Sequence, residues 1–250
     1  MKRDTSRPTT RRELVRLGAL AVLSFPGLRR SALAQNTPGA EPIKIGTIGS
    51  GRMGGTLGTL WVKAGHPVMF SSRNPEEIKS LVEGLGPLAR AGTVDEAVTF
   101  GDAVLLAVPY SAYPELGERH ARALAGKLII DVGNAVPARD GAITVEAKEA
   151  GIGLTTAKYF PGALIVRAFN TLGYGVLQRE ANRAGERMAI PMAGDDAHAL
   201  ATAQQLVRDA GFDPVVIGGL ARASEFAQGA PLYGQQLTAK QMRERAGLGQ

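Results

Sequence analysis

Three glycines at positions 49, 51 and 54 have the spacing G-x-G-x-x-G, directly after the apolar run 43–48 and before a helical pattern. Gly49 permits a tight turn from strand to helix, Gly51 leaves room for a diphosphate beside the backbone, and Gly54 lets the helix lie close to the strand. The free N–H groups at the start of that helix would bind the phosphates. In this context the motif predicts a dinucleotide-binding site; a glycine-rich turn in an unrelated α/β domain is the alternative.

The next expected strand, 67–70, indicates which dinucleotide would bind. In NAD-binding proteins an Asp or Glu about 20 residues past the glycines binds the ribose 2′-hydroxyl. Serines and Arg73 occupy that place here, and they would bind a 2′-phosphate that a carboxylate would repel. The pattern therefore favours NADP(H) over NAD(H). Residues 71–74 also suit a turn in which Asn74 caps a helix beginning at Pro75, and both interpretations can hold together.

The first 34 residues have the features of a twin-arginine secretory signal in the correct order. Two arginines at 11–12 precede an apolar stretch over 17–28, and Ala-Leu-Ala at 32–34 provides a small-x-small cleavage site. The apolar stretch is too short to cross a bilayer, so we expect no stable membrane anchor. We therefore expect export by the twin-arginine translocase to the periplasm or the medium. A disordered basic tail is the alternative.

The formal charge of +6 belongs to this same segment. Residues 1–34 contain eight Lys and Arg against two Asp and Glu, which leaves the remainder of the chain with no net charge. We therefore expect no basic face for nucleic acid. The absence of cysteine excludes disulfides and thiolate catalysis. His66, His120 and His198 lack the spacing of metal ligands, so we expect no metal site and interpret them as surface or helix-end residues.

Apolar runs alternate with helical patterns along the rest of the chain, which predicts an α/β fold of the Rossmann type, a doubly wound parallel sheet with a small C-terminal helical extension. Uninterrupted apolar runs such as 102–109 and 127–134 are typical of central strands buried on both faces. The further expected strands are 163–171, 188–193 and 213–217, and the expected helices are 75–82, 95–98, 114–124, 197–210 and 221–245.

This interpretation divides the chain into four parts. Residues 1–34 are the signal and 35–42 a polar leader. Residues 43–160 form the dinucleotide-binding core. Residues 161–250 complete the sheet and provide the substrate side and the dimer contacts.

Ligands of doubly wound sheets bind beyond the carboxyl ends of the strands, so the residues just after each strand are candidates for the site. Val108 and Pro109 follow one strand, Asn134 follows another, and Asn170 ends the next. These residues would form a wall for the ribose and nicotinamide, or they are turn residues only, and the sequence leaves both open. The glycine-containing stretch 173–175 is expected to be flexible.

Five segments together resemble the NADPH-dependent reductases of the deazaflavin coenzyme F420, and the cytosolic reductase domain of the six-transmembrane metalloreductases is similar. The resemblance extends from residue 43 to about residue 235. Its Ser-Arg pair and its Ala-Phe-Asn-Thr run are more specific than the glycines. The segments are 49–54, 72–73, 107–109, 168–171 and 194–196.

The resemblance implies where the cofactor would lie and that the chain forms a homodimer through its C-terminal helical part. One departure is that Pro-Glu-Glu at 75–77 stands where some relatives carry a basic residue. The implied contacts are Ser50, Gly51, Arg52 and Met53 for the diphosphate, Ser72 and Arg73 for the 2′-phosphate, and Val108, Pro109, Asn134, Ala168 and Asn170 for the nicotinamide end.

Three functions are compatible with these features. The first is an NADP(H)-dependent oxidoreductase that passes hydride between NADP(H) and a second acceptor such as a deazaflavin or a flavin. Direct transfer between two rings needs positioning but no acid or base, so no catalytic residue is assigned. The second is a small carbonyl or imine reductase, which would need a proton donor such as Tyr110 or Tyr174. The third is a non-catalytic NADP-binding protein.

Overall fold

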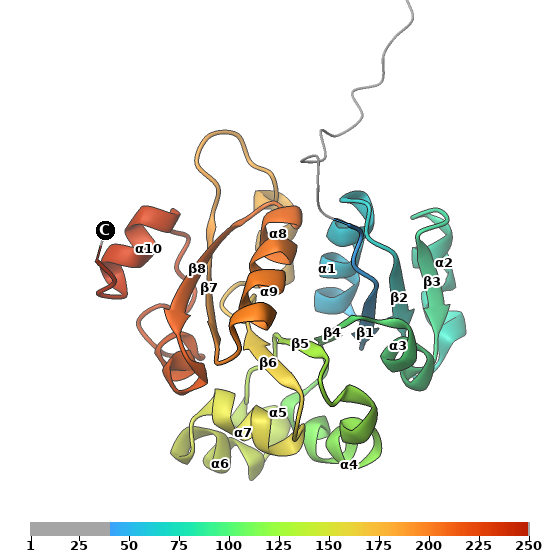
Figure 1. The fold of residues 1–250 in the computed structure, drawn as a ribbon, viewed down its shortest axis with the longest axis horizontal. Helices are drawn as coiled ribbons and strands as arrows, with labels where there is room; N and C mark the ends of the chain where they lie inside the picture. The colour runs from blue at the N-terminus through green and yellow to red at the C-terminus, as the bar shows by residue number, and fades with distance from the viewer. Residues whose placement is uncertain (1–40, 250) are drawn as a thin grey trace, which may run out of the picture. The chain divides into compact units, whose positions relative to one another are not determined.

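The computed structural model describes residues 41–249, so the expected signal at 1–34 and most of the expected leader lie outside the described residues. The strands are β1 (Ile45–Ile48), β2 (Val68–Ser71), β3 (Ala89–Gly92), β4 (Ala103–Leu106), β5 (Leu128–Asp131), β6 (Leu164–Arg167), β7 (Ala189–Gly194) and β8 (Asp213–Gly218). Within residues 41–249 they form one sheet in the order β3-β2-β1-β4-β5-β6-β7-β8 (Figure 1). In this sheet β6 and β7 pair antiparallel, and the other neighbouring strands pair parallel.

Helices cover both faces of the sheet. The α-helices are α1 (Arg52–Lys63), α2 (Lys79–Glu83), α3 (Val94–Phe100), α4 (Tyr113–Leu124), α5 (Pro137–Asp140), α6 (Ile143–Glu149), α7 (Ile152–Tyr159), α8 (Tyr174–Glu180), α9 (Ala197–Asp209) and α10 (Ala239–Arg245), and the 3₁₀ turns are η1 (Pro75–Ile78), η2 (Tyr110–Ala112) and η3 (Leu220–Phe226). The apolar side chains of α1, α8 and α9 pack on one face, and those of α3, α4, α7 and η3 pack on the other. Among the helices described, none combines the length and the apolar character that crossing a bilayer requires.

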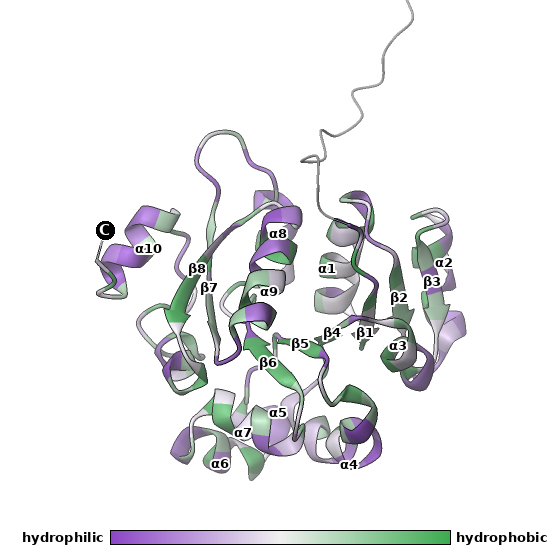
Figure 2. Ribbon diagram, viewed as in Figure 1, coloured by the Kyte–Doolittle hydropathy of each residue, from purple (hydrophilic) through white to green (hydrophobic). Residues whose placement is uncertain are grey.

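Successive side chains of the central strands point to opposite faces of the sheet, and they belong to two apolar clusters, one on each face. Leu105 belongs to the cluster under α1 and α9, whereas Val104 and Leu106 belong to the other. Figure 2 shows these strands in green, between helices that are hydrophilic over parts of their surface. The indole of Trp61 in α1 is fully buried and donates Nε1–H to the carbonyl oxygen of Leu206 in α9 at 2.8 Å. The two helices are therefore fixed to each other as well as to the sheet.

The Rossmann-like α/β fold predicted from the sequence is confirmed, but several elements differ from the predicted ones. The edge strand β3 and the helices between β5 and β6 were not predicted. β3 reads Ala-Arg-Ala-Gly, and its two central residues are exposed, so it carries neither the apolar run nor the β-branched residues that mark a strand.

The chain after β8 does not form the long helix that was predicted over 221–245. It forms η3, then an irregular segment over 227–238, then α10. Gly229 and Gly234 in that segment have φ values of +86° and +71°, which a continuous helix does not permit. Residues 173–175, predicted to be flexible, instead start α8, with Gly173 at its N-cap position. The predicted strand over 163–171 ends at Arg167, because Phe169 has a φ of +63°.

A fully buried ion pair joins the ends of β5 and β6. Asp131 and Arg167 are register partners in these parallel strands, and both side chains have no exposed surface. Arg167 Nη1 lies 2.5 Å from Asp131 Oδ2, and its Nη2 donates to the carbonyl oxygen of Gly133 at 2.7 Å. The pair therefore closes the carboxyl end of the sheet at this point and also holds the first residues after β5.

The Asp131 carboxylate also binds two helices, α4 and α7, that pack on the same face of the sheet. Tyr113 in α4 donates its hydroxyl to Asp131 Oδ1 at 2.6 Å, and Thr156 in α7 donates to Oδ2 at 2.8 Å. Burial and the neighbouring Asp131 carboxylate raise the pKa of Tyr113 well above its ordinary value, so the phenol keeps the proton that it donates. Asp131 thus accepts hydrogen bonds from three elements besides its own strand.

Replacing Arg167 by methionine is expected to destabilise the fold by about 3–5 kcal/mol, because the Asp131 carboxylate would stay buried without a counter-charge. The double variant Arg167→Met with Asp131→Leu should lose less, since both charges are then removed. Urea unfolding followed by circular dichroism measures both. A single variant that is as stable as the wild type would contradict this account of the pair.

Candidate dinucleotide site at the carboxyl edge of the sheet

A cleft of about 1110 Å³ opens beyond the carboxyl ends of β1, β2 and β4. This is the edge at which doubly wound sheets bind their ligands. We call it the edge cleft. Its lining residues are Ile48, Gly49, Ser50, Gly51, Ser71, Ser72, Arg73, Glu77, Ile78, Val94, Asp95, Ala107, Val108, Pro109, Ser111, Ala112, Glu115, Leu116, Arg119 and His120.

The three glycines of the motif have different surroundings. Gly49 has a φ of +90°, and a methyl group added to Gly54 would lie 1.9 Å from the carbonyl oxygen of Gly49. These two positions therefore need glycine for the turn and for close packing of α1. A methyl group added to Gly51 would meet nothing within 4 Å. Gly51 thus leaves an open space on the cleft side, where a diphosphate would approach the backbone.

The start of α1 offers uncapped N–H groups to that space. Gly51 is the N-cap residue and provides no side-chain hydrogen bond, and the first turn contains no acidic residue. A helix start of this kind carries a partial positive charge together with free donors. The open space and the free donors fit the diphosphate of a dinucleotide.

The two serines at the end of β2 have separate roles: Ser71 is the last residue of the strand and Ser72 follows it. Ser71 is buried, and its hydroxyl donates to the carbonyl oxygen of Thr47 in β1 at 2.5 Å. Ser72 is half-buried and its hydroxyl accepts the N–H of Asn74 at 3.1 Å. Arg73 is exposed on the cleft wall, and within the described residues it has no hydrogen-bonding or ion-pair partner. Ser72 and Arg73 therefore remain available to a ligand phosphate.

Glu77 lies on the same wall, which the sequence analysis did not anticipate. Its Oε1 accepts a hydrogen bond from Asn74 Nδ2 at 2.9 Å. Asn74 does occupy the N-cap position of η1, but its side chain makes no capping hydrogen bond. The predicted side-chain cap is therefore wrong, because the amide turns toward Glu77 instead. A carboxylate here opposes part of the positive charge of Arg73.

The opposite wall comes from the end of β4 and from α4. Val108 and Pro109 line the cleft, as the sequence analysis expected. His120 is 8% exposed and its Nδ1 lies 3.3 Å from Asp95 Oδ1, so the prediction of a surface position is wrong for this histidine. Residues 41–249 contain no group of three His, Asp or Glu side chains that could hold a metal ion.

His66 is also buried, but it follows the end of α1, where its N–H donates to the carbonyl oxygen of Trp61 at 3.0 Å, so the helix-end alternative holds for this histidine. Its Nδ1 accepts the N–H of Ile43 at 3.0 Å, and its Nε2 lies 3.1 Å from Asp209 Oδ2. The ring thus joins the entrance of β1 to the end of α9. His198 is exposed, as expected.

Six expected cofactor contacts do not line the edge cleft, namely Arg52, Met53, Gly54, Asn134, Ala168 and Asn170. Ala168 is fully buried, and half-buried Met53 packs against the apolar cluster under α1. Asn134 Nδ2 donates to the carbonyl oxygen of Asn170 at 2.7 Å, and Asn170 Nδ2 donates to that of Phe226 at 2.9 Å. The structure thus brings Asn134 and Asn170 together, but the residues that line the edge cleft include none from the connection after β5. Asn170 Oδ1 is buried and has no partner within the described residues.

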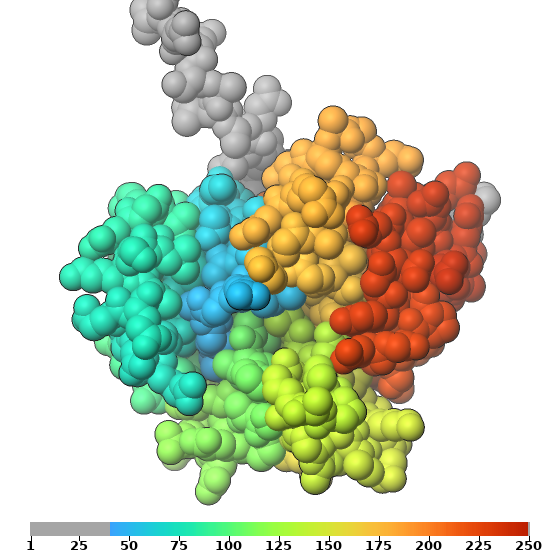
Figure 3. Space-filling view, turned by 180° about the vertical axis from the view of Figure 1, so that it is seen from behind, coloured from blue at the N-terminus to red at the C-terminus, as the bar shows by residue number. Residues whose placement is uncertain are grey.

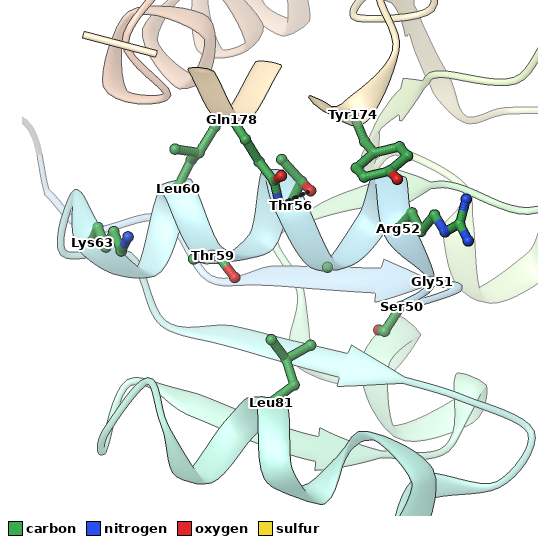
Figure 4. A pocket seen from close by; sticks show the side chains of 11 residues that line it. Ser50, Gly51, Arg52, Thr56, Thr59, Leu60, Lys63, Leu81, Tyr174 and Gln178 are labelled. Carbon is green, nitrogen blue, oxygen red and sulfur yellow. Dashed lines mark hydrogen bonds between the residues drawn. The ribbon is translucent and has the colours of Figure 1, made fainter. Parts of the chain in front are cut away.

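A second hollow of about 460 Å³ lies on the outer side of α1, between α2 and α8 (Figures 3 and 4). It shares Ser50 and Gly51 with the edge cleft. Arg52 points into this hollow, with its guanidinium carbon 5.4 Å from the ring centroid of Tyr174 (Figure 4). Arg52 and Tyr174 therefore stand beside the expected diphosphate position but outside the edge cleft.

The two tyrosines named as possible proton donors are placed differently. Tyr110 is fully buried, and its hydroxyl donates to the carbonyl oxygen of Ile152 at 3.0 Å. Burial and the nearby Asp131 carboxylate raise the pKa of Tyr110 further from neutrality. Tyr110 is therefore a structural residue. Tyr174 is 37% exposed and lies against Arg52.

Comparison with known proteins relates the chain to oxidoreductases. Residues 44–135 match the family described as "NADP oxidoreductase coenzyme F420-dependent". Over 185 residues the chain is 32% identical to the metalloreductase STEAP3 of Rattus norvegicus, an alignment that covers 74% of this chain and 36% of that protein. The human metalloreductase STEAP2 is 27% identical over 187 residues, which cover 74% of this chain and 35% of that protein. The chain thus spans well under two thirds of these relatives.

Solved structures share the fold. A hypothetical protein from Sinorhizobium meliloti superposes with a TM-score of 0.68 and 25% identity, covering 79% of this chain and 96% of that one. An imine reductase from Myxococcus stipitatus, solved with NAD+, has a TM-score of 0.53 and 19% identity, covering 74% of this chain and 58% of that one. The described residues therefore form a Rossmann-like α/β domain related to oxidoreductases, and residues 44–135 match an NADP oxidoreductase family.

Proposed function

We propose that this protein is an NADP(H)-dependent oxidoreductase that passes hydride between NADP(H) and a second small molecule, of the deazaflavin or flavin class. The observation that carries the proposal is the open space at Gly51, which faces uncapped N–H groups at the start of α1 and shares one cleft with Arg73. The match of residues 44–135 to an NADP oxidoreductase family supports it.

The residues of the chain would bind and orient the cofactor along the edge cleft. The N–H groups of α1 would hold the diphosphate, and Ser72 with Arg73 would hold the 2′-phosphate. Val108 and Pro109 would then limit where the nicotinamide can lie. The nicotinamide supplies the hydride when bound, so the protein contributes position and orientation.

The alternative of a carbonyl or imine reductase receives less support from the site. Such a reaction needs a proton donor near the nicotinamide, and Tyr110 uses its hydroxyl to bind Ile152 in the interior. Tyr174 lines the second hollow, on the outer side of α1 beside Arg52, rather than the edge cleft. We therefore favour hydride transfer between two rings, which needs no such donor.

Replacing Gly51 by valine should weaken NADP+ binding more than about tenfold, because the new side chain would fill the space of the diphosphate. The fold should persist, since nothing lies within 4 Å of the added carbon. Calorimetric titration and thermal unfolding measure the two effects. Gly175→Val in α8 is the matched control, because its site is equally open but lies outside the cleft. Normal binding by Gly51→Val would place the diphosphate elsewhere.

Replacing Arg73 by aspartate should lower the affinity for NADP+ roughly 10- to 100-fold, the value of one or two charge-assisted hydrogen bonds. The affinity for NAD+ should change far less, so the preference should narrow or reverse. Lys148→Asp makes the same charge change at an exposed position of α6 that does not line the cleft, and it is the control. Equal affinities of the wild type for both cofactors would refute the assignment of the 2′-phosphate.

We further propose that the protein is exported in the folded state with NADP(H) already bound. The cofactor site combines the ends of β1, β2 and β4, so an unfolded chain could not carry the cofactor. Replacing the arginines at 11 and 12 by lysine should leave an uncleaved precursor in the cytoplasm.

Wild-type protein from the periplasm should begin near residue 35 and release NADP(H) on denaturation. Fractionation, N-terminal sequencing and absorbance of the released nucleotide check this. Periplasmic protein that never contains nucleotide would contradict loaded export.

A further inference from the structure

A second ion pair lies behind the wall of the edge cleft, between Arg139 and Asp140 at the end of α5. Arg139 Nε lies 3.0 Å from Asp140 Oδ1, and its Nη2 lies 2.7 Å from Oδ2. The Asp140 side chain has no exposed surface, whereas that of Arg139 is 48% exposed. Nη2 of Arg139 also donates to the carbonyl oxygen of Asn134 at 2.6 Å. The guanidinium therefore bridges the buried carboxylate and the irregular connection after β5.

The Asp140 carboxylate joins two connections that are far apart in the sequence. Its Oδ2 accepts the N–H of Val136 at 2.7 Å, in the connection after β5. Its Oδ1 accepts the N–H of Ser111 at 3.1 Å, in the connection after β4. Ser111 lines the edge cleft, together with Val108 and Pro109 of the same connection. One carboxylate thus sets the spacing between the cleft wall and the chain that carries Asn134.

The charge of this carboxylate is stable under working conditions. Burial alone would raise the pKa of Asp140, but the hydrogen bonds from Arg139, Val136 N–H and Ser111 N–H outweigh it and lower the pKa from 3.8 to about 2. A lowered pKa means that the stabilisation by the ionised form is present above pH 3.8 and is lost as the pH falls toward 2. The bonds therefore persist across the neutral range.

We propose that Arg139 and Asp140 are positioning residues for the nicotinamide end of the bound cofactor. Neither residue lines the cleft; Asp140 binds the N–H of Ser111, which does line it, and Arg139 binds the carbonyl oxygen of Asn134 in the connection after β5. Their effect is to hold the wall after β4 and the connection after β5 at one fixed separation, so that the nicotinamide finds a preformed surface. This inference rests on the proposed function, because NADP(H) must occupy the edge cleft for that surface to act on it.

The effect is confined to one half of the cofactor. The adenosine half would lie against Ser72 and Arg73, which follow β2, and no hydrogen bond of the described residues joins this part to Arg139 or Asp140. Loosening the pair therefore changes the surface for the nicotinamide and leaves the surface for the 2′-phosphate as it was. The affinity for a ligand that lacks the nicotinamide half therefore reports on the 2′-phosphate surface alone.

The test compares NADPH with adenosine 2′,5′-bisphosphate, which lacks the nicotinamide half, by calorimetric titration of the mature protein. Arg139→Ala is the main variant, because its side chain is half exposed and its removal leaves the buried carboxylate bonded to Ser111 and Val136. NADPH should bind about tenfold more weakly, and adenosine 2′,5′-bisphosphate should bind within twofold of the wild type. The emission of the bound nicotinamide should also shift toward that of free NADPH.

Two further variants distinguish a positioning role of the ion pair from a general effect of removing a surface charge. Arg139→Lys restores the charge but not the fork that reaches both Asp140 and Asn134, so it should recover part of the NADPH affinity. Lys158→Ala is the control, because it removes an ion pair outside the cleft, in which Lys158 Nζ lies 2.6 Å from Glu146 Oε1 and both side chains are more exposed than those of Arg139 and Asp140. It should change neither affinity.

Equal weakening of both ligands by Arg139→Ala, or no change in either, would overturn the positioning role and leave the proposed function intact. If wild-type protein bound neither ligand, the proposed function would fail first and the inference with it. A loss confined to NADPH, absent from Lys158→Ala and partly reversed by Arg139→Lys, supports the inference.

Discussion

Asp131 and Arg167 face each other at the ends of two parallel strands, in a part of the sheet that water does not reach. A buried ion pair is stabilising only when further hydrogen bonds satisfy both groups, because each charge has lost its hydration. Here Tyr113, Thr156 and the N–H of Gly133 donate to the carboxylate, and the carbonyl oxygen of Gly133 accepts from Arg167 Nη2. Arg167 Nε is buried and has no partner among the described residues, so the guanidinium is satisfied only in part. The buried charges are stable only when α4, α7 and the connection after β5 occupy the positions from which they donate or accept these hydrogen bonds. The pair therefore ties β5, β6, α4 and α7 together at the carboxyl edge of the sheet.

The cleft depends on a contrast between neighbouring glycines. At Gly49 and Gly54 the chain has closed every space that a side chain would need, whereas at Gly51 it has left that space open. Gly51 is exposed at the uncapped start of α1, and this is the space that the proposed function assigns to the diphosphate.

Local sequence patterns were enough to predict the fold class, because each apolar run and the glycine motif lie within a few consecutive residues. They did not suffice for the walls of the cleft. Asn74 turns its amide toward Glu77 rather than capping η1, and Asn170 lies behind the wall, because both outcomes depend on where other elements pack. Two signals were present in the sequence. Asp131 and Arg167 carry opposite charges, and each is the last residue of an apolar strand. Side chains alternate along a strand, so the two adjacent serines at the end of β2 have different partners, and the Ser71 hydroxyl binds the carbonyl oxygen of Thr47.

The two contacts of the His66 ring, with the N–H of Ile43 and with Asp209, bear on how the protein can be immobilised. The ring fastens the backbone of Ile43 to the end of α9, at the amino edge of the sheet, while the cleft opens at the carboxyl edge. The described fold thus begins at a fixed point on the side away from the edge cleft. A linker joined ahead of Ile43 begins on that side, which makes this end suitable for attachment to a solid support or an electrode with the cleft left facing the solution.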